Sequence, residues 1–155
     1  DMLPLGRLSK RGPKGPERDC WLTSAEQQTL MTLWTIFRSP LMFGGALVDL
    51  DEATRRLLTN DAVLAVGIQG TGGSQLLRED SLCVWTAGDS RDQSVRYVAV
   101  FNLGDAPLAV TLALADHGLP TGSATNLWTG EGVAMAEGSF AAEIEPHGCV
   151  YLKLS

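Results

Sequence analysis

The 155-residue chain is acidic, with 18 Asp and Glu residues against 12 Lys and Arg residues, and 45% of its residues are hydrophobic. The hydrophobic fraction supports a real core, while the acidic balance argues against a nucleic-acid partner. No apolar run approaches the roughly 20 residues that a membrane-spanning helix needs, so we expect no membrane partner.

The chain starts abruptly at Asp1, without a signal segment or a basic leader. Residues 3–5 are expected to form the end of a strand, with Gly6 as its exit turn. Residues 7–19 predict a polar loop, because breaks of the Gly-Pro type exclude a stable helix. The basic side chains of this loop have no aromatic neighbours between them, so a solvated loop is favoured over a nucleic-acid site.

A helix is predicted from Thr23 to Phe37. Thr23 is a favourable N-cap, and Glu26 three residues later completes a capping box. Apolar residues between Leu30 and Phe37 cover more than one helical stripe, which indicates a helix buried on most of its circumference. Pro40 ends the helix, because the residue before a proline disfavours the α conformation.

An apolar run at residues 41–43 is typical of a strand covered on both faces. Asp49 and Glu52 repeat the capping pattern for a helix over residues 51–58, and Asn60 caps one further turn. Strands that alternate with helices imply a parallel sheet. A pattern this short cannot bury itself, so we expect the chain to be the tail of a larger protein and its isolated form to associate through Leu30, Trp34 and Phe37.

The pattern changes after Ile68. Gly67, Gly70, Gly72 and Gly73 predict a glycine-rich linker, and the chain beyond Ser81 predicts an all-β region. Short apolar segments separated by turns point to an antiparallel sandwich or Greek key. The expected strands are residues 82–86, 95–101, 108–114, 124–128, 133–136, 140–144 and 150–154.

Cys20, Cys83 and Cys149 are odd in number, and none lies in a Cys-x-x-Cys pair. Neither a disulfide framework nor a zinc site is indicated, and buried thiols are expected, with a Cys83–Cys149 bridge left open. His117 and His147 are too few for a histidine-based metal site. We therefore expect no metal and no cofactor.

The ordered series of segments resembles the C-terminal third of a family 27 glycoside hydrolase, the α-galactosidase and α-N-acetylgalactosaminidase family. In the first half the resemblance is carried by Asp1-Met2-Leu3, Leu33-Trp34, Arg38-Ser39-Pro40-Leu41, Leu57-Leu58-Thr59-Asn60 and Val63-Leu64-Ala65-Val66. In the second half it is carried by Val84-Trp85-Thr86, Tyr97-Val98-Ala99-Val100-Phe101, Asn126-Leu127-Trp128 and Pro146-His147-Gly148.

This resemblance implies that residues 1–70 are the end of a (β/α)8 TIM barrel, its last two βα units, and that residues 71–155 are an antiparallel Greek-key β-sandwich domain. Active sites of such barrels lie at the C-terminal ends of the strands. Asp1 and Met2 match the final Asp-Met of the family's seventh-strand motif, which lines the sugar pocket. The carboxylate would accept hydrogen bonds from sugar hydroxyls, and the methionine would pack on an apolar sugar face.

The implied chemistry is retaining hydrolysis of terminal α-galactosides by two carboxyl groups about 5–5.5 Å apart. In the family these are aspartates on earlier strands, so we expect no catalytic residue in this chain and no activity of the chain alone. Glu143 and Glu145 share one strand face, which is expected to face solvent. Ala46 stands where the family usually has an acidic residue or asparagine, which puts the family's usual contacts after the eighth strand in doubt. Because the earlier strands are missing from this sequence, α-N-acetylgalactosaminides and β-L-arabinopyranosides also remain open as substrates.

Two other interpretations concern the β region: a carbohydrate-binding module, or a purely structural domain. A module needs exposed aromatic side chains, whereas core packing is the expected role of these residues, which favours the structural domain. The aromatic candidates are Trp85, Tyr97, Phe101, Trp128, Phe140 and Tyr151. The expected partners are a carbohydrate and the remainder of the barrel. Many family members are exported or lysosomal, which leaves a secreted or periplasmic location open.

Overall fold

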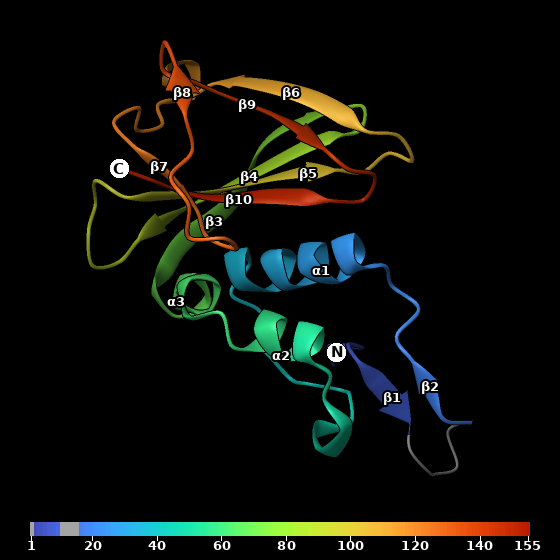
Figure 1. Ribbon diagram of the computed structural model, residues 1–155. Helices are drawn as coiled ribbons and strands as arrows, with labels where there is room; N and C mark the ends of the chain where they lie inside the picture. Colours follow the sequence, from blue (N-terminus) through green and yellow to red (C-terminus); the bar gives the residue numbers. More distant parts are fainter. Residues whose placement is uncertain (1, 10–15) are drawn as a thin grey trace.

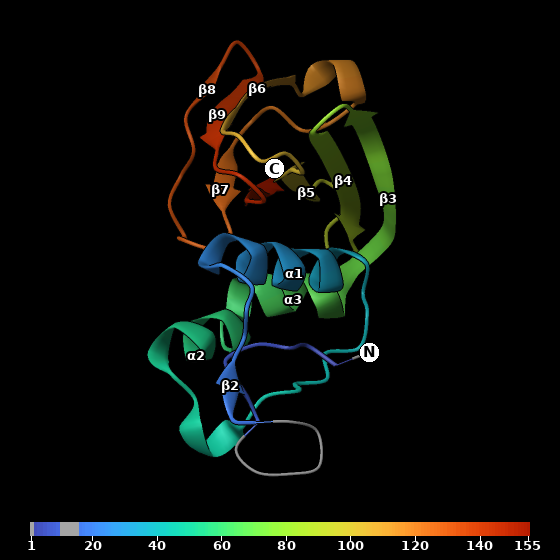
Figure 2. The same ribbon diagram turned by 90° about the vertical axis from the view of Figure 1, so that its right-hand side faces the viewer.

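The computed structural model describes residues 2–9 and 16–155. Three helices lie between a layered β domain and a short N-terminal hairpin, as both ribbon views show (Figures 1 and 2). The hairpin consists of β1 (Arg7–Ser9) and β2 (Arg18–Asp19), and the helices are α1 (Ser24–Ile36), α2 (Glu52–Leu58) and α3 (Asp61–Gln69). The hairpin corrects the expectation of a loop without secondary structure, because β1 and β2 pair antiparallel across it.

Helix α1 begins as its sequence predicts. The Thr23 hydroxyl accepts a hydrogen bond from the Glu26 amide at 3.2 Å, and the Glu26 carboxylate accepts one from the Thr23 amide at 2.7 Å. The helix ends at Ile36, before the position expected from Pro40. Arg38 adopts a left-handed conformation with φ of 56°, so the chain has already left the helix before the proline.

Helices α2 and α3 are confirmed, but the expected cap of α2 is wrong. Asp51 rather than Asp49 accepts the hydrogen bond from the Thr54 amide, at 2.8 Å. Asp49 belongs instead to a short 3-10 helix, Leu47–Asp49. Asn60 caps α3 through the Val63 amide at 3.1 Å, and α3 continues well past the single turn that was expected.

The expected glycine linker is also wrong. Gly67 lies within α3, and residues 70–73 open a strand, β3 (Gly70–Glu79), that pairs antiparallel with β4 (Leu82–Asp89). The pairing shifts register between Thr71 and Ser74, where Gly72 has a positive φ of 61°. A bulge of this kind uses the freedom of glycine, and the ladder with β4 outweighs the weak strand propensity of these residues.

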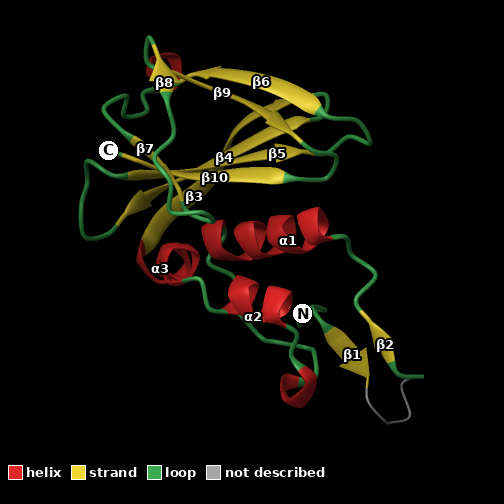
Figure 3. Ribbon diagram, in the orientation of Figure 1, coloured by secondary structure: helices red, strands yellow, loops and turns green. Residues whose placement is uncertain are grey.

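All seven strands that the sequence predicts are present, and they form an antiparallel sandwich (Figure 3). The larger sheet has the order β3-β4-β5-β10-β7, and the smaller sheet has the order β6-β9-β8. The remaining bounds are β5 (Arg96–Asn102), β6 (Leu108–Ala113), β7 (Ala124–Asn126), β8 (Met135–Ala136), β9 (Ser139–Ile144) and β10 (Cys149–Leu154), with a 3-10 turn at Ala115–His117. The Greek-key arrangement stays a prediction.

Strand β5 of the larger sheet packs against an apolar core on each face. Val98 and Val100 of β5 pack in the core between the two sheets, whereas Tyr97 and Phe101 pack in a second core together with residues of α1 and α3. Successive strand residues point to opposite faces, which explains why β5 is an almost continuous apolar run.

The aromatic residues of the β region behave as the core-packing interpretation expects. Tyr97, Phe101, Phe140 and Tyr151 are buried, and the two tryptophans, Trp85 and Trp128, are partly buried against the helix-side core. A row of exposed rings for stacking on a polysaccharide is not formed by these six residues. The carbohydrate-binding interpretation required exposed aromatic rings, and these six residues do not supply them.

A third apolar cluster lies on the side of α1 away from the sandwich. Leu3, Leu5 and Met31 are buried there, and Leu30 and Trp34 pack against them. The expectation that Leu30 and Trp34 are exposed is therefore wrong, because the N-terminal segment covers them. Phe37, by contrast, is exposed and lies against Trp85, with ring centroids 4.2 Å apart.

The three cysteines are free thiols, so the Cys83–Cys149 bridge that was left open is not formed. Burial raises the pKa of the Cys149 thiol, which lies 3.3 Å from the Thr32 hydroxyl oxygen. Within the described residues, no helix is both long and apolar enough to cross a membrane.

Candidate functional site

The N-terminal segment and the segment after α1 run side by side in parallel. The Leu3 amide donates to the Met42 carbonyl at 2.7 Å, and the Gly44 amide donates to the Leu3 carbonyl at 2.9 Å. Further along, the Ala46 amide donates to the Arg7 carbonyl at 2.7 Å. The strands expected at residues 3–5 and 41–43 are thus reduced to a parallel bridge, Leu3 with Phe43.

Gly45 is required for this close approach. A Cβ atom at Gly45 would lie 2.4 Å from the Leu5 carbonyl oxygen and 2.5 Å from Cζ of Phe43. At Gly44 a Cβ would lie 3.0 Å from the Leu3 carbonyl oxygen and 3.1 Å from the Met2 Cβ. The glycine pair that the sequence marks as a turn therefore lets the two parallel segments pack together.

Met2, one of the two site residues that the sequence predicts, lies at the start of this parallel pair and is 54% exposed. Asp1, the other, lies outside the described residues. Met2 belongs to a run of exposed apolar side chains that we call the open edge. The open edge consists of Met2, Leu41, Met42, Leu47 and Val48.

The strand face that carries Glu143 and Glu145 is exposed to solvent. Glu143 and Glu145 are exposed on either side of the buried Ile144, as their alternation predicts. Among the described residues, no group of three or more His, Cys, Asp and Glu side chains is arranged to hold a metal ion.

Trp21 is a feature that the sequence does not single out. Its side chain is 88% exposed, and the Arg18 guanidinium lies 5.8 Å from the centre of its ring. It borders an apolar hollow of about 190 Å³ that is also lined by Pro4, Leu8 and Cys20. Tryptophan normally signals a core position, so its type gives no hint of this exposure.

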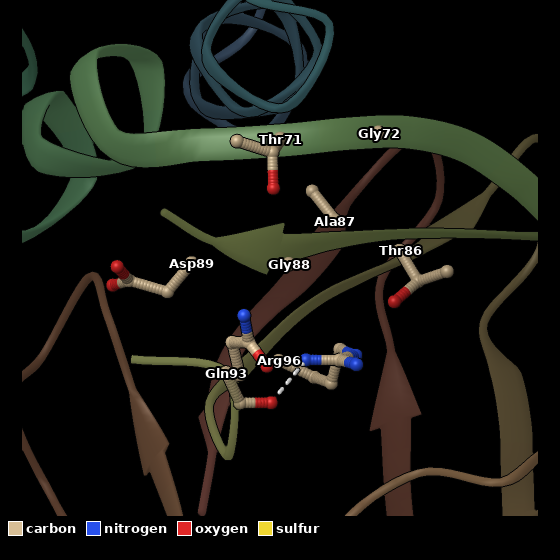
Figure 4. A pocket seen from close by; sticks show the side chains of 8 residues that line it. All are labelled: Thr71, Gly72, Thr86, Ala87, Gly88, Asp89, Gln93 and Arg96. Atoms are coloured by element: carbon tan, nitrogen blue, oxygen red, sulfur yellow. Dashed lines mark hydrogen bonds between the residues drawn. The ribbon is translucent and has the colours of Figure 1, made fainter. Parts of the chain in front are cut away.

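A larger and more polar hollow, of about 420 Å³, lies at one end of β3, β4 and β5 (Figure 4). Thr71 pairs with Gly88, and Gly88 pairs with Arg96, so these three residues form one row across the sheet. In Figure 4 the Thr71 hydroxyl points toward the strand that carries Gly88, and Arg96 lies on the other side. The hollow is lined by Thr71, Gly72, Thr86, Ala87, Gly88, Asp89, Gln93 and Arg96.

Asp89 is buried at the rim of this hollow and is well satisfied. Its carboxylate accepts hydrogen bonds from the Tyr97 hydroxyl and from the amides of Arg91 and Asp92, the last two at 2.7 and 3.3 Å. The bond from Tyr97, followed by the amide bonds, holds the pKa of Asp89 below its ordinary value. Burial, and then the contact with Asp89, raises the pKa of Tyr97.

Two other polar groups of the hollow are not satisfied. Arg96 Nη1 donates to the carbonyls of Gln93 and Val95 at 2.8 and 2.9 Å, but no carboxylate of the described residues lies within ion-pair distance of this guanidinium. The Thr86 hydroxyl oxygen is buried and has no hydrogen-bond partner in the described part of the chain. The sequence does contain an indication of this hollow, because Thr86, Gly88 and Arg96 interrupt strands that are otherwise apolar on that face.

Residues 79–154 match the family model of the alpha galactosidase C-terminal beta sandwich domain. An alpha-galactosidase from Cyamopsis tetragonoloba is 29% identical over 133 residues, which cover 83% of this chain and 32% of the relative.

Solved structures extend the likeness to the helical part. A family 27 β-L-arabinopyranosidase from Geobacillus stearothermophilus is 42% identical with a TM-score of 0.91, over 100% of this chain and 36% of that chain. A proposed alpha-N-acetylgalactosaminidase from Bacillus halodurans C-125 is 37% identical with a TM-score of 0.90, over 99% of this chain and 38% of that chain. The chain is therefore similar over its whole length to the C-terminal part of family 27 glycoside hydrolases, and it spans 32–38% of the length of these relatives.

Proposed function

We propose that the protein carrying this chain is a retaining glycoside hydrolase, and that residues up to about 70 contribute the last two βα units of its (β/α)8 barrel. The observation that carries the proposal is the parallel bridge between Leu3 and Phe43, with α1 between them in the sequence. A parallel strand pair linked through a helix is the repeating unit of such barrels. The residues from about 71 to 155 form the accompanying β domain.

The open edge supports this arrangement. Leu47 and Val48 are 72% and 81% exposed, and they follow Ala46, whose amide donates to the Arg7 carbonyl beside the parallel pair. A lone pair of parallel segments is unusual, since parallel sheets are normally covered on both faces. In the proposed protein, the preceding barrel strand pairs with the N-terminal segment and the open edge packs inside the ring.

The substrate we propose is a terminal pyranoside with the ring configuration of galactose. Relatives include alpha-galactosidases, and a variant of the Geobacillus stearothermophilus β-L-arabinopyranosidase was solved in complex with arabinose. An α-D-galactopyranoside and a β-L-arabinopyranoside present the same ring hydroxyls and differ by one hydroxymethyl group. The 42% identity to the arabinopyranosidase favours the arabinopyranoside as the second candidate substrate.

The catalytic carboxylates in this proposal are two aspartates on earlier barrel strands, about 5–5.5 Å apart. Met2 lines the sugar pocket through its exposed side chain, together with Asp1. The 155-residue chain alone is then inactive, because it holds neither aspartate.

The experiment compares the full-length protein with the 155-residue chain on p-nitrophenyl α-galactopyranoside and p-nitrophenyl β-L-arabinopyranoside. We expect the full-length protein to hydrolyse at least one of them and the chain alone to hydrolyse neither. In the full-length protein, Met2→Ala should lower kcat/KM by about tenfold, since one apolar contact with the sugar is lost. Met135→Ala, the same change in the β domain, should leave kcat/KM unaltered. Hydrolysis by the isolated chain would contradict the proposal.

A further inference from the structure

The polar hollow of Figure 4 lies at one end of β3, β4 and β5 in the larger sheet. Five strands of the larger sheet face only three of the smaller sheet, so part of its inner face has no sheet above it. Val84 of β4 packs in the core between the sheets, and Thr86 and Gly88 follow it on the same face. The inward positions thus change from apolar to polar along β4.

Strand β5 shows the same change. Val100 and Val98 pack in the inter-sheet core, and Arg96, two residues before Val98, carries a half-buried guanidinium into the hollow. A buried hydroxyl that has no hydrogen-bond partner is energetically unfavourable, so its presence at a hollow points to a partner supplied by a ligand. The Thr86 hydroxyl is such a group, and it borders the same hollow as the unpaired Arg96.

The arginines of the hollow beside α2 are paired. Arg55 and Arg56 line a hollow beside α2, but both donate to the Glu52 carboxylate, at 2.8 and 2.9 Å. The bonds from Arg55 and then Arg56 lower the pKa of Glu52 to about 2. Arg96 differs because only its Nη1 atom is engaged, which leaves the N–H groups on Nε and Nη2 for a ligand.

We propose that this hollow binds an acidic sugar, a pyranose that carries a carboxylate. A guanidinium with free N–H groups on one edge matches the two oxygens of a carboxylate. The hydroxyls of Thr71 and Thr86 and the amide of Gln93 supply the donors and acceptors that ring hydroxyls need. Gly88 forms the floor, and about 420 Å³ lies within the usual range of about 300–1,000 Å³ for small-molecule sites.

The lining residues also argue against a neutral sugar held by stacking, because none of them is aromatic. Asp89 lines the rim as well, but its carboxylate is already engaged by the Tyr97 hydroxyl and two backbone amides. The free charge of the hollow is therefore that of Arg96. This site is separate from the proposed glycosidase pocket and does not depend on the catalytic proposal.

The test titrates galacturonate into the full-length protein by isothermal titration calorimetry, with galactose and inorganic phosphate in separate arms. Arg96→Gln should weaken galacturonate binding by tenfold or more, because the charged partner of the carboxylate is lost. Arg91→Gln, the same charge change in the adjacent exposed turn, should leave it unchanged. Neither substitution should alter glycosidase activity, so a failure of the proposed activity is distinguishable from a failure of this site.

Arg96→Gln also removes the bonds from Arg96 to the carbonyls of Gln93 and Val95, which hold the turn together. A second variant therefore separates the loss of the ligand contact from a structural change in this turn. Gly88→Ala keeps these bonds but places a methyl group 3.3 Å from Thr71 Oγ1 and 3.7 Å from Arg96 Nη1. It should also weaken galacturonate binding by about tenfold without lowering Tm. The proposal is overturned if galacturonate binds equally to the wild type and both variants, or if it binds none of them. Phosphate or galactose that binds as tightly through Arg96 would also overturn it.

Discussion

The β-sandwich and the open edge differ in how completely they bury their own apolar side chains. In the sandwich, Phe101 and Tyr151 are buried by α1 and α3 on one face of the larger sheet, and Val98 and Val100 by the smaller sheet on the other. At the open edge, the parallel segments hold together through single backbone bonds and leave Leu47 and Val48 exposed.

Two segments can therefore share the backbone hydrogen bonds of a sheet while the apolar side chains beside them stay exposed. The Leu3–Phe43 bridge has the geometry of a parallel sheet and is covered on the side of α1, but the open edge beside it is exposed, whereas the sandwich is covered on both faces at β5. Stability should therefore be concentrated in the sandwich and its helix layer. The open edge should tolerate substitution in the isolated chain and become sensitive only when a partner covers it.

The largest effect is expected from Phe101→Ala. Phe101 is 1% exposed and lies in the core between the larger sheet and the helices. Removing its ring should lower the free energy of unfolding by about 3–5 kcal/mol, through lost burial and a cavity. Urea unfolding of the isolated chain measures the change, with Phe37→Ala, an exposed phenylalanine, as the control. A loss below about 1 kcal/mol would show that this core is not the main source of stability.

Asp89→Asn should have the next largest effect, about 1–3 kcal/mol, because a buried carboxylate with three hydrogen bonds is replaced by an amide that also carries unpaired donors. The wild type should also show a matching pH dependence. The folded-state pKa of Asp89 lies below its ordinary value, so its stabilisation is complete above about pH 4 and is lost as the pH falls further.

Unfolding at a series of pH values between about 2 and 7 checks this, with Asp116→Asn, an exposed carboxyl, as the matched control. The decline of stability below about pH 4 should be shallower in Asp89→Asn than in the wild type. An equally steep decline in both would mean that Asp89 is not a source of acid sensitivity.

Thr23→Ala should lower the free energy of unfolding by about 1 kcal/mol, because it removes the N-cap of α1 and one half of the capping box. Helix α1 joins the sandwich to the N-terminal segment, so this change tests whether the two regions unfold together. Ser24→Ala, which changes a neighbouring hydroxyl that is not the cap, is the control. Equal effects of the two substitutions would show that the cap has no special role.

The smallest effect is expected from Leu47→Ser combined with Val48→Ser. Both side chains are largely exposed, so the stability of the isolated chain should change by no more than about 0.5 kcal/mol. Self-association of the isolated chain, measured by light scattering, should fall because the open edge becomes polar. Unchanged association would indicate that the contact surface lies elsewhere.

The sequence predicts well the features that depend on neighbouring residues. Thr23 with Glu26, and Asn60 with Val63, are local capping pairs, and both form as expected. The seven apolar strands of the β domain are also present, because alternation and short turns largely determine a sandwich. Strand β3 was missed because its glycines favour a linker until the ladder with β4 is known.

The functional features depend on pairings that no local pattern contains. Thr71 and Arg96 share a hollow only because β3, β4 and β5 align them in register with Gly88. The expected strands at the open edge are reduced to a bridge because, among the described residues, each segment has only the other as a neighbour. Met2 was predicted from the family resemblance and is exposed beside that bridge, so its role in sugar binding stays a prediction.

Amide hydrogen exchange, compared between the isolated chain and the full-length protein, tests whether a preceding barrel strand completes the open edge. We expect the amides of Leu3 and Gly44, and those of residues 46–48, to exchange quickly in the isolated chain and to become protected in the full-length protein. The amides of β5 should be equally slow in both. Equal protection of the open edge in the two forms would contradict the claim that it is completed by a preceding barrel strand.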